Sequence, residues 1–163
     1  MILTGNEIEK EVKRSKITIV PFNKVQVNPN SYNYRLGSKL IDLSAKNVKE
    51  IIIPKNGFVL KPNQIYLAST YEVLGSNKYA MSLIGRSSLG RLGLFLQISA
   101  NLGHTGSEHS WTLELVCVKP IRIYPRMIIG QISFWDNKGQ ITPYKKRYSD
   151  HNSPKQSRIR GVA

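Results

Sequence analysis

From Ile51 to Trp135 the chain alternates between short apolar runs and turn-forming residues, and this spacing limits what it can fold into. Gly, Pro and Asn occupy the breaks, as in Pro54–Gly57 and Gly75–Asn77. Many short strands at close spacing are typical of a β-sandwich or a β-barrel with at most one or two helices. We expect strands at Ile51–Ile53, Phe58–Leu60, Gln64–Thr70, Tyr79–Ile84, Leu92–Ser99, Trp111–Val118, Ile121–Tyr124 and Gln131–Trp135.

The N-terminal segment carries the only clear helix signal. Thr4-Gly-Asn-Glu7 is a capping box, and it predicts a short helix that ends near Ser15. A short strand at Ile17–Pro21 and an interrupted strand from Tyr32 to Leu43 should follow. A second helical turn is expected at Leu89–Leu92, capped by the two serines before it.

Length and composition indicate one soluble domain. The 163 residues can bury a core, and no run of about 18 apolar residues could span a membrane. Charge follows Met1–Thr4, so no secretory signal is expected, and Cys117 should be a buried hydrophobe rather than half of a disulfide. These features favour a cytoplasmic protein.

The net charge of +14 favours an anionic partner. The basic residues are scattered along the chain, and no nucleic-acid-binding motif accompanies them. We therefore favour a triphosphate over a polynucleotide as the ligand, with no membrane partner. The basic groups lie at Lys10–Lys16, Arg86 and Arg91, Arg122 and Arg126, Lys145–Arg147, and Lys155–Arg160.

Two segments could carry chemistry. Gly85–Arg91 combines glycines, two hydroxyls and two guanidiniums, a composition suited to binding phosphate. Glu114 interrupts an apolar strand, where it shares a face with Thr112 and Val116. Such a carboxylate is either a surface charge on an edge strand or a buried functional acid. Glu72 and Glu108 should be exposed.

Several ordered motifs resemble the dCTP deaminases of the trimeric dUTPase superfamily. These are Gly85-Arg-Ser-Ser-Leu-Gly-Arg-Leu-Gly93, Thr112-Leu-Glu-Leu115, Asn30-Ser-Tyr-Asn-Tyr-Arg-Leu-Gly37, the opening Met1-Ile-Leu-Thr4 and Ile128-Ile-Gly-Gln-Ile-Ser-Phe134. The resemblance covers nearly the whole chain. It implies a mainly β, distorted β-barrel or jelly-roll-like dUTPase fold with a short N-terminal helix. It further implies a homotrimer with active sites shared between subunits.

The resemblance also implies a division of the chain. Residues 1–143 would form the barrel, and residues 144–163 a basic arm that closes over the nucleotide. Composition alone leaves a disordered tail as the alternative for the second part. Apolar faces at Leu94–Leu96 and Ile128-Ile129 should contribute to a subunit interface.

The residues that the chain contains and lacks limit the possible routes of deamination. A zinc deaminase needs His-x-Glu and a later Pro-Cys-x-x-Cys, neither of which is present. A lone carboxylate acting as general base and then acid remains. By resemblance Glu114 has that role, Ser87 and the carbonyl of Ala100 position the water, and Arg91 lies beside them. The predicted nucleotide-binding residues are Arg86, Ser88, Asn101, His104, Thr112, Tyr148, His151, Lys155 and Arg158. Mg²⁺ would be bound through the triphosphate, with no metal held by the protein.

Departures from the family pattern fall at sugar and phosphate contacts. Asn33 replaces an aspartate, Leu102 an arginine found in some deaminases, and His104 the aspartate that recognises the 3′-hydroxyl. In the arm, His151 replaces a glutamine and Ser153 a glycine. The deaminating residues Ser87, Arg91 and Glu114 are retained.

Four functions remain open. The leading one is deamination of dCTP to dUTP, which supplies thymidylate synthesis. The second is a bifunctional enzyme that continues to dUMP, against which the loss of the aspartate at His104 argues. A deaminase of an altered cytosine nucleotide and a non-catalytic nucleotide-binding regulator are the others. The expected nucleotide partners are dCTP and dUTP, with dTTP as a further candidate.

Overall fold

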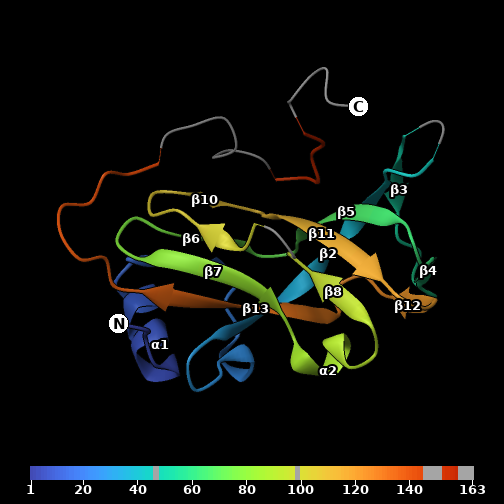
Figure 1. Ribbon diagram of the computed structural model, residues 1–163. Coiled ribbons are helices and arrows are strands. Elements are labelled where there is room, and N and C mark those ends of the chain that lie inside the picture. The colour runs from blue at the N-terminus through green and yellow to red at the C-terminus, as the bar shows by residue number, and fades with distance from the viewer. Residues whose placement is uncertain (46–47, 98–99, 145–151, 158–163) are drawn as a thin grey trace.

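Antiparallel strands dominate the computed structural model, which describes residues 1–45, 48–97, 100–144 and 152–157. The largest sheet in this part of the chain has eight strands and curls around the core (Figure 1). Across it the order is β8 (Leu94–Leu96), β11 (Thr112–Cys117), β5 (Ile65–Thr70), β2 (Tyr32–Asp42), β13 (Ile128–Trp135), β7 (Ala80–Gly85) and β9 (Leu102–Gly103), with β3 (Glu50–Ile52) paired to β2.

The long strand β2 produces the curl. Its first residues pair with β13 from Tyr32 to Arg35, and its later residues pair with β5. The register with β5 shifts between Leu36 and Leu40, and the register of β13 with β2 shifts between Ile128 and Gly130. Irregularities of this kind bend a strand and increase its twist. One strand thus joins two halves of the sheet that face each other across the core.

Smaller elements cover the ends of this sheet. β6 (Val73–Ser76) lies between β1 (Ile17–Val20) and β10 (Glu108–His109), and β4 (Phe58–Leu60) pairs with β12 (Ile121–Ile123). The helices are α1 (Gly5–Lys13), α2 (Ser87–Gly90) and the 3₁₀ turn η1 (Lys24–Gln26). No helix among the described residues is long and apolar enough to cross a membrane.

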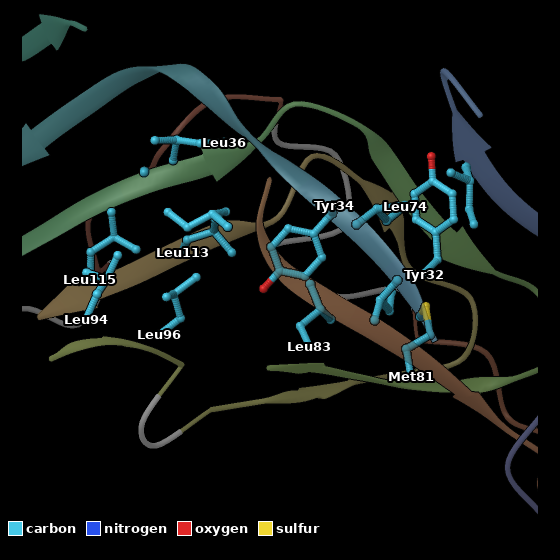
Figure 2. Close-up of a cluster of buried hydrophobic side chains, with 14 of the residues drawn as sticks. Tyr32, Tyr34, Leu36, Leu74, Met81, Leu83, Leu94, Leu96, Leu113 and Leu115 are labelled. Atoms are coloured by element: carbon cyan, nitrogen blue, oxygen red, sulfur yellow. The ribbon is translucent and has the colours of Figure 1, made fainter. Parts of the chain in front are cut away.

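Side chains from several strands meet in one core. Figure 2 shows Tyr32, Tyr34 and Leu36 of β2 pointing toward the same interior as Leu113 and Leu115 of β11. Residues of β7 and β8 complete the cluster: Met81, Leu83, Leu94 and Leu96. All of these side chains are buried. Because hydrophobic burial is the main favourable term in folding, this cluster fixes how the sheet closes.

The sequence-based expectations for the mainly β fold are confirmed, and most expected strands lie within a few residues of their predicted ends. Thr4 caps α1 as predicted, accepting a hydrogen bond from the backbone N–H of Glu7 at 3.4 Å. The expectation that Gly75–Asn77 is simply a turn is wrong, because Gly75 and Ser76 belong to β6. The buried Cys117 is also confirmed, and burial raises the pKa of its thiol.

The expected interface faces are partly wrong. Leu94, Leu96 and Ile129 are buried in the core of the single chain. Phe95, which points to the opposite face of β8, is 42% exposed. Only the outward-facing residues of these runs are therefore free to contact another subunit.

A buried carboxylate ties α1 to the barrel. Glu11 is 2% exposed and accepts hydrogen bonds from Tyr79 Oη at 2.8 Å and Arg14 Nη1 at 3.1 Å. Lys78 Nζ donates at 3.2 Å to Glu11 Oε2, the oxygen that also accepts from Tyr79. These partners, led by the Tyr79 hydrogen bond, lower the pKa of Glu11 to about 2. The charged carboxylate is thus favoured in the folded state.

We expect acid to destabilise the fold through Glu11. Its pKa is lower in the folded chain than in the unfolded one, so the stabilisation is complete above about pH 4.5 and is lost as pH falls toward 2. Glu11→Gln should lower stability at pH 6 by about 2–3 kcal/mol and flatten the dependence on pH. Urea unfolding at pH 6 and pH 3 measures both effects.

Glu7→Gln is the control, because Glu7 lies on the same helix and pairs with Lys10 at the surface. It should change stability little at either pH. An equal acid sensitivity of the wild type and Glu11→Gln would contradict the assignment.

Candidate active site

The segment after β7 presents the phosphate-binding candidates at the surface. Arg86 is the N-cap of α2, and Arg91 follows its last residue. Ser87, Ser88 and Arg91 are exposed, whereas Arg86 is half-buried. The expected helical turn therefore exists but starts at Ser87, two residues earlier than predicted. The expected serine cap is wrong, since Arg86 occupies the N-cap position and makes no side-chain capping bond.

The two arginines of this segment form no ion pair with the part of the chain that the structure describes. In the described residues, every salt bridge involves other cations, so Arg86 and Arg91 have no carboxylate partner. A guanidinium without a carboxylate partner can bind phosphate oxygens with its planar fork. This segment can therefore accept an anion.

Glu114 lies at the middle of β11, between β5 and the end of β8. Leu113 and Leu115 on either side are fully buried, and Glu114 itself is half-buried on the opposite face. Its backbone N–H donates to Gln97 Oε1 at 2.7 Å, and its backbone oxygen accepts from Gln97 N at 3.3 Å. Its carboxylate has no hydrogen-bond or ion-pair partner among the residues that the structure describes.

The structure brings Ala100 close to Glu114. Gln97 Nε2 donates to the carbonyl oxygen of Ala100 at 3.2 Å, while the other end of the same amide binds Glu114. Asn101 follows Ala100 and lies beside β7, where its carbonyl oxygen accepts from Leu83 N at 2.9 Å. Its side chain lies 3.4 Å from Ser82 Oγ. Two predicted site residues, Ala100 and Glu114, are thus joined through one glutamine.

The segment that carries Ser87 starts at Gly85, close to the end of β8 that precedes Gln97. A Cβ built on Gly85 would lie 3.6 Å from Leu96 Cδ1, and Leu96 directly precedes Gln97. Among the described residues, no hydrogen bond or ion pair joins Ser87 or Arg91 to Glu114. The single chain therefore places these residues in one region without closing a complete site around Glu114.

The expectation that Glu72 is exposed is wrong. It is fully buried, with 0% exposure, and its carboxylate binds Arg35 Nε at 2.6 Å and Arg35 N at 2.8 Å. The apolar residues of β6 that follow it carry it into the interior. Glu108 is exposed as expected and accepts from Thr18 at 2.6 Å.

Glu114 therefore differs from the other enclosed acids by its lack of a partner rather than by the depth of its burial. Glu11 and Glu72 are more deeply buried, but cations and hydrogen-bond donors hold both. A carboxylate that is already paired is a poor proton acceptor, because its charged form is stabilised. Of the three, only Glu114 has a carboxylate without a hydrogen-bond or ion-pair partner among the described residues.

His104 lies in a pocket next to the start of the C-terminal segment. Its ring stacks on Tyr144 with centroids 5.1 Å apart and planes at 20°. The backbone N–H of Tyr144 donates to Thr105 O at 2.8 Å. The cavity has a volume of about 440 Å³, and residues 137–144 form one of its walls. His104 is thus already in contact with an aromatic side chain of its own chain.

Residues 152–157 lie against the start of β11. Asn152 Oδ1 accepts from Ser110 N at 3.2 Å, and Lys155 N donates to Thr112 Oγ1 at 3.4 Å. Two predicted nucleotide-binding residues, Thr112 and Lys155, are therefore in contact. Tyr148, His151 and Arg158 lie outside the described residues. In Figure 1 residues 152–157, drawn in red, lie on the side of the molecule that carries β11.

No group of three or more His, Cys, Asp or Glu side chains suited to a metal ion occurs within the described ranges. His109 packs against the ring of Trp111 with centroids 4.3 Å apart, and its Nδ1 lies 3.1 Å from Ser110 O.

Comparison with known proteins shows the family of the chain. Residues 2–137 match the family model described as dCTP deaminase-like. The chain is 41% identical over 160 residues to a dUMP-forming dCTP deaminase of Clostridium acetobutylicum, covering 93% of this chain and 92% of the relative. It is 42% identical over 161 residues to one of Hathewaya histolytica, covering 94% and 93%.

A dCTP deaminase of Rhodopirellula baltica is 41% identical over 147 residues, which are 85% of this chain and 74% of that protein. The crystal structure of 2′-deoxycytidine 5′-triphosphate deaminase from Agrobacterium tumefaciens superposes with a TM-score of 0.69. Its sequence identity is 24%, and the match covers 82% of this chain and 46% of that one, so this chain spans about half of its length. The fold is thus that of a deaminase-type barrel. The chain belongs to the dCTP deaminase-like family.

Sequence reasoning did not identify Gln97. It was included in an expected strand from Leu92 to Ser99, whereas β8 ends at Leu96 and Gln97 has a φ of 51°. The available signal was a single amide side chain at the end of an apolar run. Only the structure shows that this amide reaches two site residues.

The turn between α2 and β8 should tolerate only glycine at residue 93. Gly93 has a φ of 88°, and a Cβ there would lie 2.5 Å from Val118 Cγ2. Gly93→Ala should therefore lower the free energy of unfolding by about 1–3 kcal/mol. Gly90→Ala is the matched control, because nothing lies within 4 Å of its Cβ position and it occupies a helix.

The control should be neutral or stabilising by about 0.5–1 kcal/mol. Urea unfolding of both variants measures the difference. Equal stabilities of the two variants would show that the turn is not constrained in this way.

Proposed function

We propose that this chain deaminates dCTP hydrolytically to dUTP and ammonia, with Glu114 as the general base and then the general acid. The observation that carries the proposal is the half-buried carboxylate of Glu114, which has no partner among the described residues and lies between two buried leucines. The backbone N–H of the same residue is linked through Gln97 to the carbonyl of Ala100. The relatives at 41–42% identity, whose names state that they act on dCTP, support the choice of substrate.

The chemistry requires water to attack C4 of cytosine. Glu114 would accept a proton from that water as its oxygen bonds to C4. Glu114 would then deliver this proton to N3 of the cytosine ring. It would next take the proton of the new C4 hydroxyl and pass it to the amino group, which leaves as ammonia while the C4 carbonyl forms. The carbonyl of Ala100 and the hydroxyl of Ser87 would hold the water, and Arg91 would lie beside them. Positioning and proton transfer of this kind each contribute large factors to a rate.

Substrate binding would use the unpaired cations of the chain. Arg86 and Ser88 would bind the triphosphate, and Asn101, His104 and Thr112 would contact the nucleoside. Tyr148, His151, Lys155 and Arg158 would belong to the closing arm of residues 144–163. Mg²⁺ would bind through the triphosphate oxygens, because this ion keeps several waters and prefers phosphate ligands. No zinc would take part.

In a homotrimer, a neighbouring subunit would complete the active site around Glu114. Ser87, Ser88 and Arg91 are exposed in the single chain, and the neighbouring Leu92, Phe95 and Val118 are exposed apolar residues. Apolar residues around a polar site suit a subunit interface. Light scattering should give three chains per particle, and a monomer with full turnover would contradict shared sites. A cytoplasmic location remains part of the proposal.

A second candidate is a deaminase that continues to dUMP and pyrophosphate. The names of the Clostridium and Hathewaya relatives, which specify dUMP formation, favour it. The histidine at residue 104 argues against the second step, because its ring stacks on Tyr144 and it cannot act as the carboxylate that it replaces.

Replacing Glu114 tests the proposal. Wild-type protein with Mg²⁺ should release ammonia from dCTP, and Glu114→Gln should lower kcat by at least about 100-fold, because general acid–base catalysis contributes about 10²–10⁴-fold. Glu108→Gln is the control, since Glu108 is an exposed acid that binds Thr18. It should retain wild-type turnover.

The products and substrates of the same assay separate the remaining functions. dUTP alone supports the leading proposal, whereas dUMP with pyrophosphate supports the second candidate. Turnover of CTP, dCMP or 5-substituted dCTP in place of dCTP would show an altered substrate. Tight binding of dCTP without ammonia release would show a nucleotide-binding regulator and refute the enzyme.

A further inference from the structure

The amide of Gln97 replaces a backbone group in the ladder between β8 and β11. Opposite residues of a regular antiparallel pair exchange two backbone hydrogen bonds. Gln97 N donates to Glu114 O at 3.3 Å, which is one of them. In the second bond, Glu114 N would donate to the backbone oxygen of Gln97 in a regular ladder. Here it donates at 2.7 Å to the side-chain oxygen Oε1 of Gln97 instead.

The backbone conformation of Gln97 explains this exchange. Its φ of 51° lies in the left-handed region, which non-glycine residues rarely adopt. This φ turns the chain out of the ladder one residue after β8 ends at Leu96. The turn would leave the half-buried N–H of Glu114 without its backbone partner, and an unpaired N–H of this kind is costly.

The other end of the same amide reaches Ala100. Nε2 donates to its carbonyl oxygen at 3.2 Å. A carbonyl oxygen has two lone pairs, so one remains for a second donor such as a water. The amide plane is rigid, so the position of Glu114 N and the direction of the Ala100 carbonyl are coupled through one side chain.

We propose that Gln97 is a positioning residue that holds the main chain of the general base and the water-binding carbonyl of Ala100 in one fixed geometry. It does not touch the reacting atoms. This inference rests on the proposed deamination for its role, but the hydrogen bonds themselves can be tested without turnover. A glutamine serves here because it both accepts and donates, and a carboxylate or an apolar side chain of the same length cannot do both.

Two substitutions separate the functions of the amide. Gln97→Met keeps the length and removes both hydrogen bonds. Gln97→Glu keeps the acceptor for Glu114 N but replaces the donor toward Ala100 with a repelling oxygen. Gln64→Met is the control. Gln64 directly precedes β5, and it is another half-buried glutamine whose side chain accepts a hydrogen bond, in this case from Tyr66 Oη.

Kinetics form the first measurement. Gln97→Met should lower kcat for ammonia release about 10- to 100-fold with little change in KM, because a small displacement of catalytic groups costs up to about 100-fold. Gln97→Glu should lower kcat as much although its melting temperature stays nearer to the wild type. Gln64→Met should keep the wild-type kcat and KM.

Amide hydrogen exchange at Glu114 is the second measurement and needs no substrate. Exchange should accelerate about 10-fold in Gln97→Met and stay slow in Gln97→Glu. Unchanged exchange in Gln97→Met, or a wild-type kcat in that variant, would overturn the proposal. If wild-type protein released no ammonia, the deaminase function would fail, while the exchange rates would still decide whether the amide holds Glu114.

Discussion

Burial of Leu113 and Leu115 in the core determines where the catalytic candidate lies. Alternate residues of a strand point to opposite faces, so placing these leucines inside places Glu114 outside. A slip of one residue in the register of β11 would bury the carboxylate and expose both leucines, at a large cost in hydrophobic energy. The pairing of β11 with β5 on one side and β8 on the other fixes this register. The core thus determines the face of β11 on which the acid lies.

The enclosed acids of this chain divide by their partners. Glu11 and Glu72 are surrounded by donors and cations, and they connect α1 and β2 to the rest of the barrel. Breaking a buried pair of this kind leaves an uncompensated charge, so these acids stabilise the fold. Glu114 lacks such partners in the described part of the chain, and its neighbours bind only its main chain. The distinction between structural and functional acids here is one of pairing.

The fold could be predicted from the sequence because local patterns agree with it. The capping box at Thr4, the punctuated strands and the face assignment of Glu114 all follow from neighbouring residues. Glu72 could not be placed in this way, because its burial depends on Arg35, 37 positions away in the chain. Gln97 was missed for a similar reason, since its role depends on a left-handed φ and a distant strand. Long-range pairing of polar groups leaves no periodic signal.

The backbone contact between Tyr144 and Thr105 has a consequence for the residues that follow it. It fixes the origin of the C-terminal segment on the barrel, and Lys155 reaches Thr112 only eleven positions later. Eleven positions of chain keep the local concentration of Lys155 around β11 high, independent of the concentration of protein in solution. The contact between Lys155 and Thr112 is therefore intramolecular, and dilution would not weaken it.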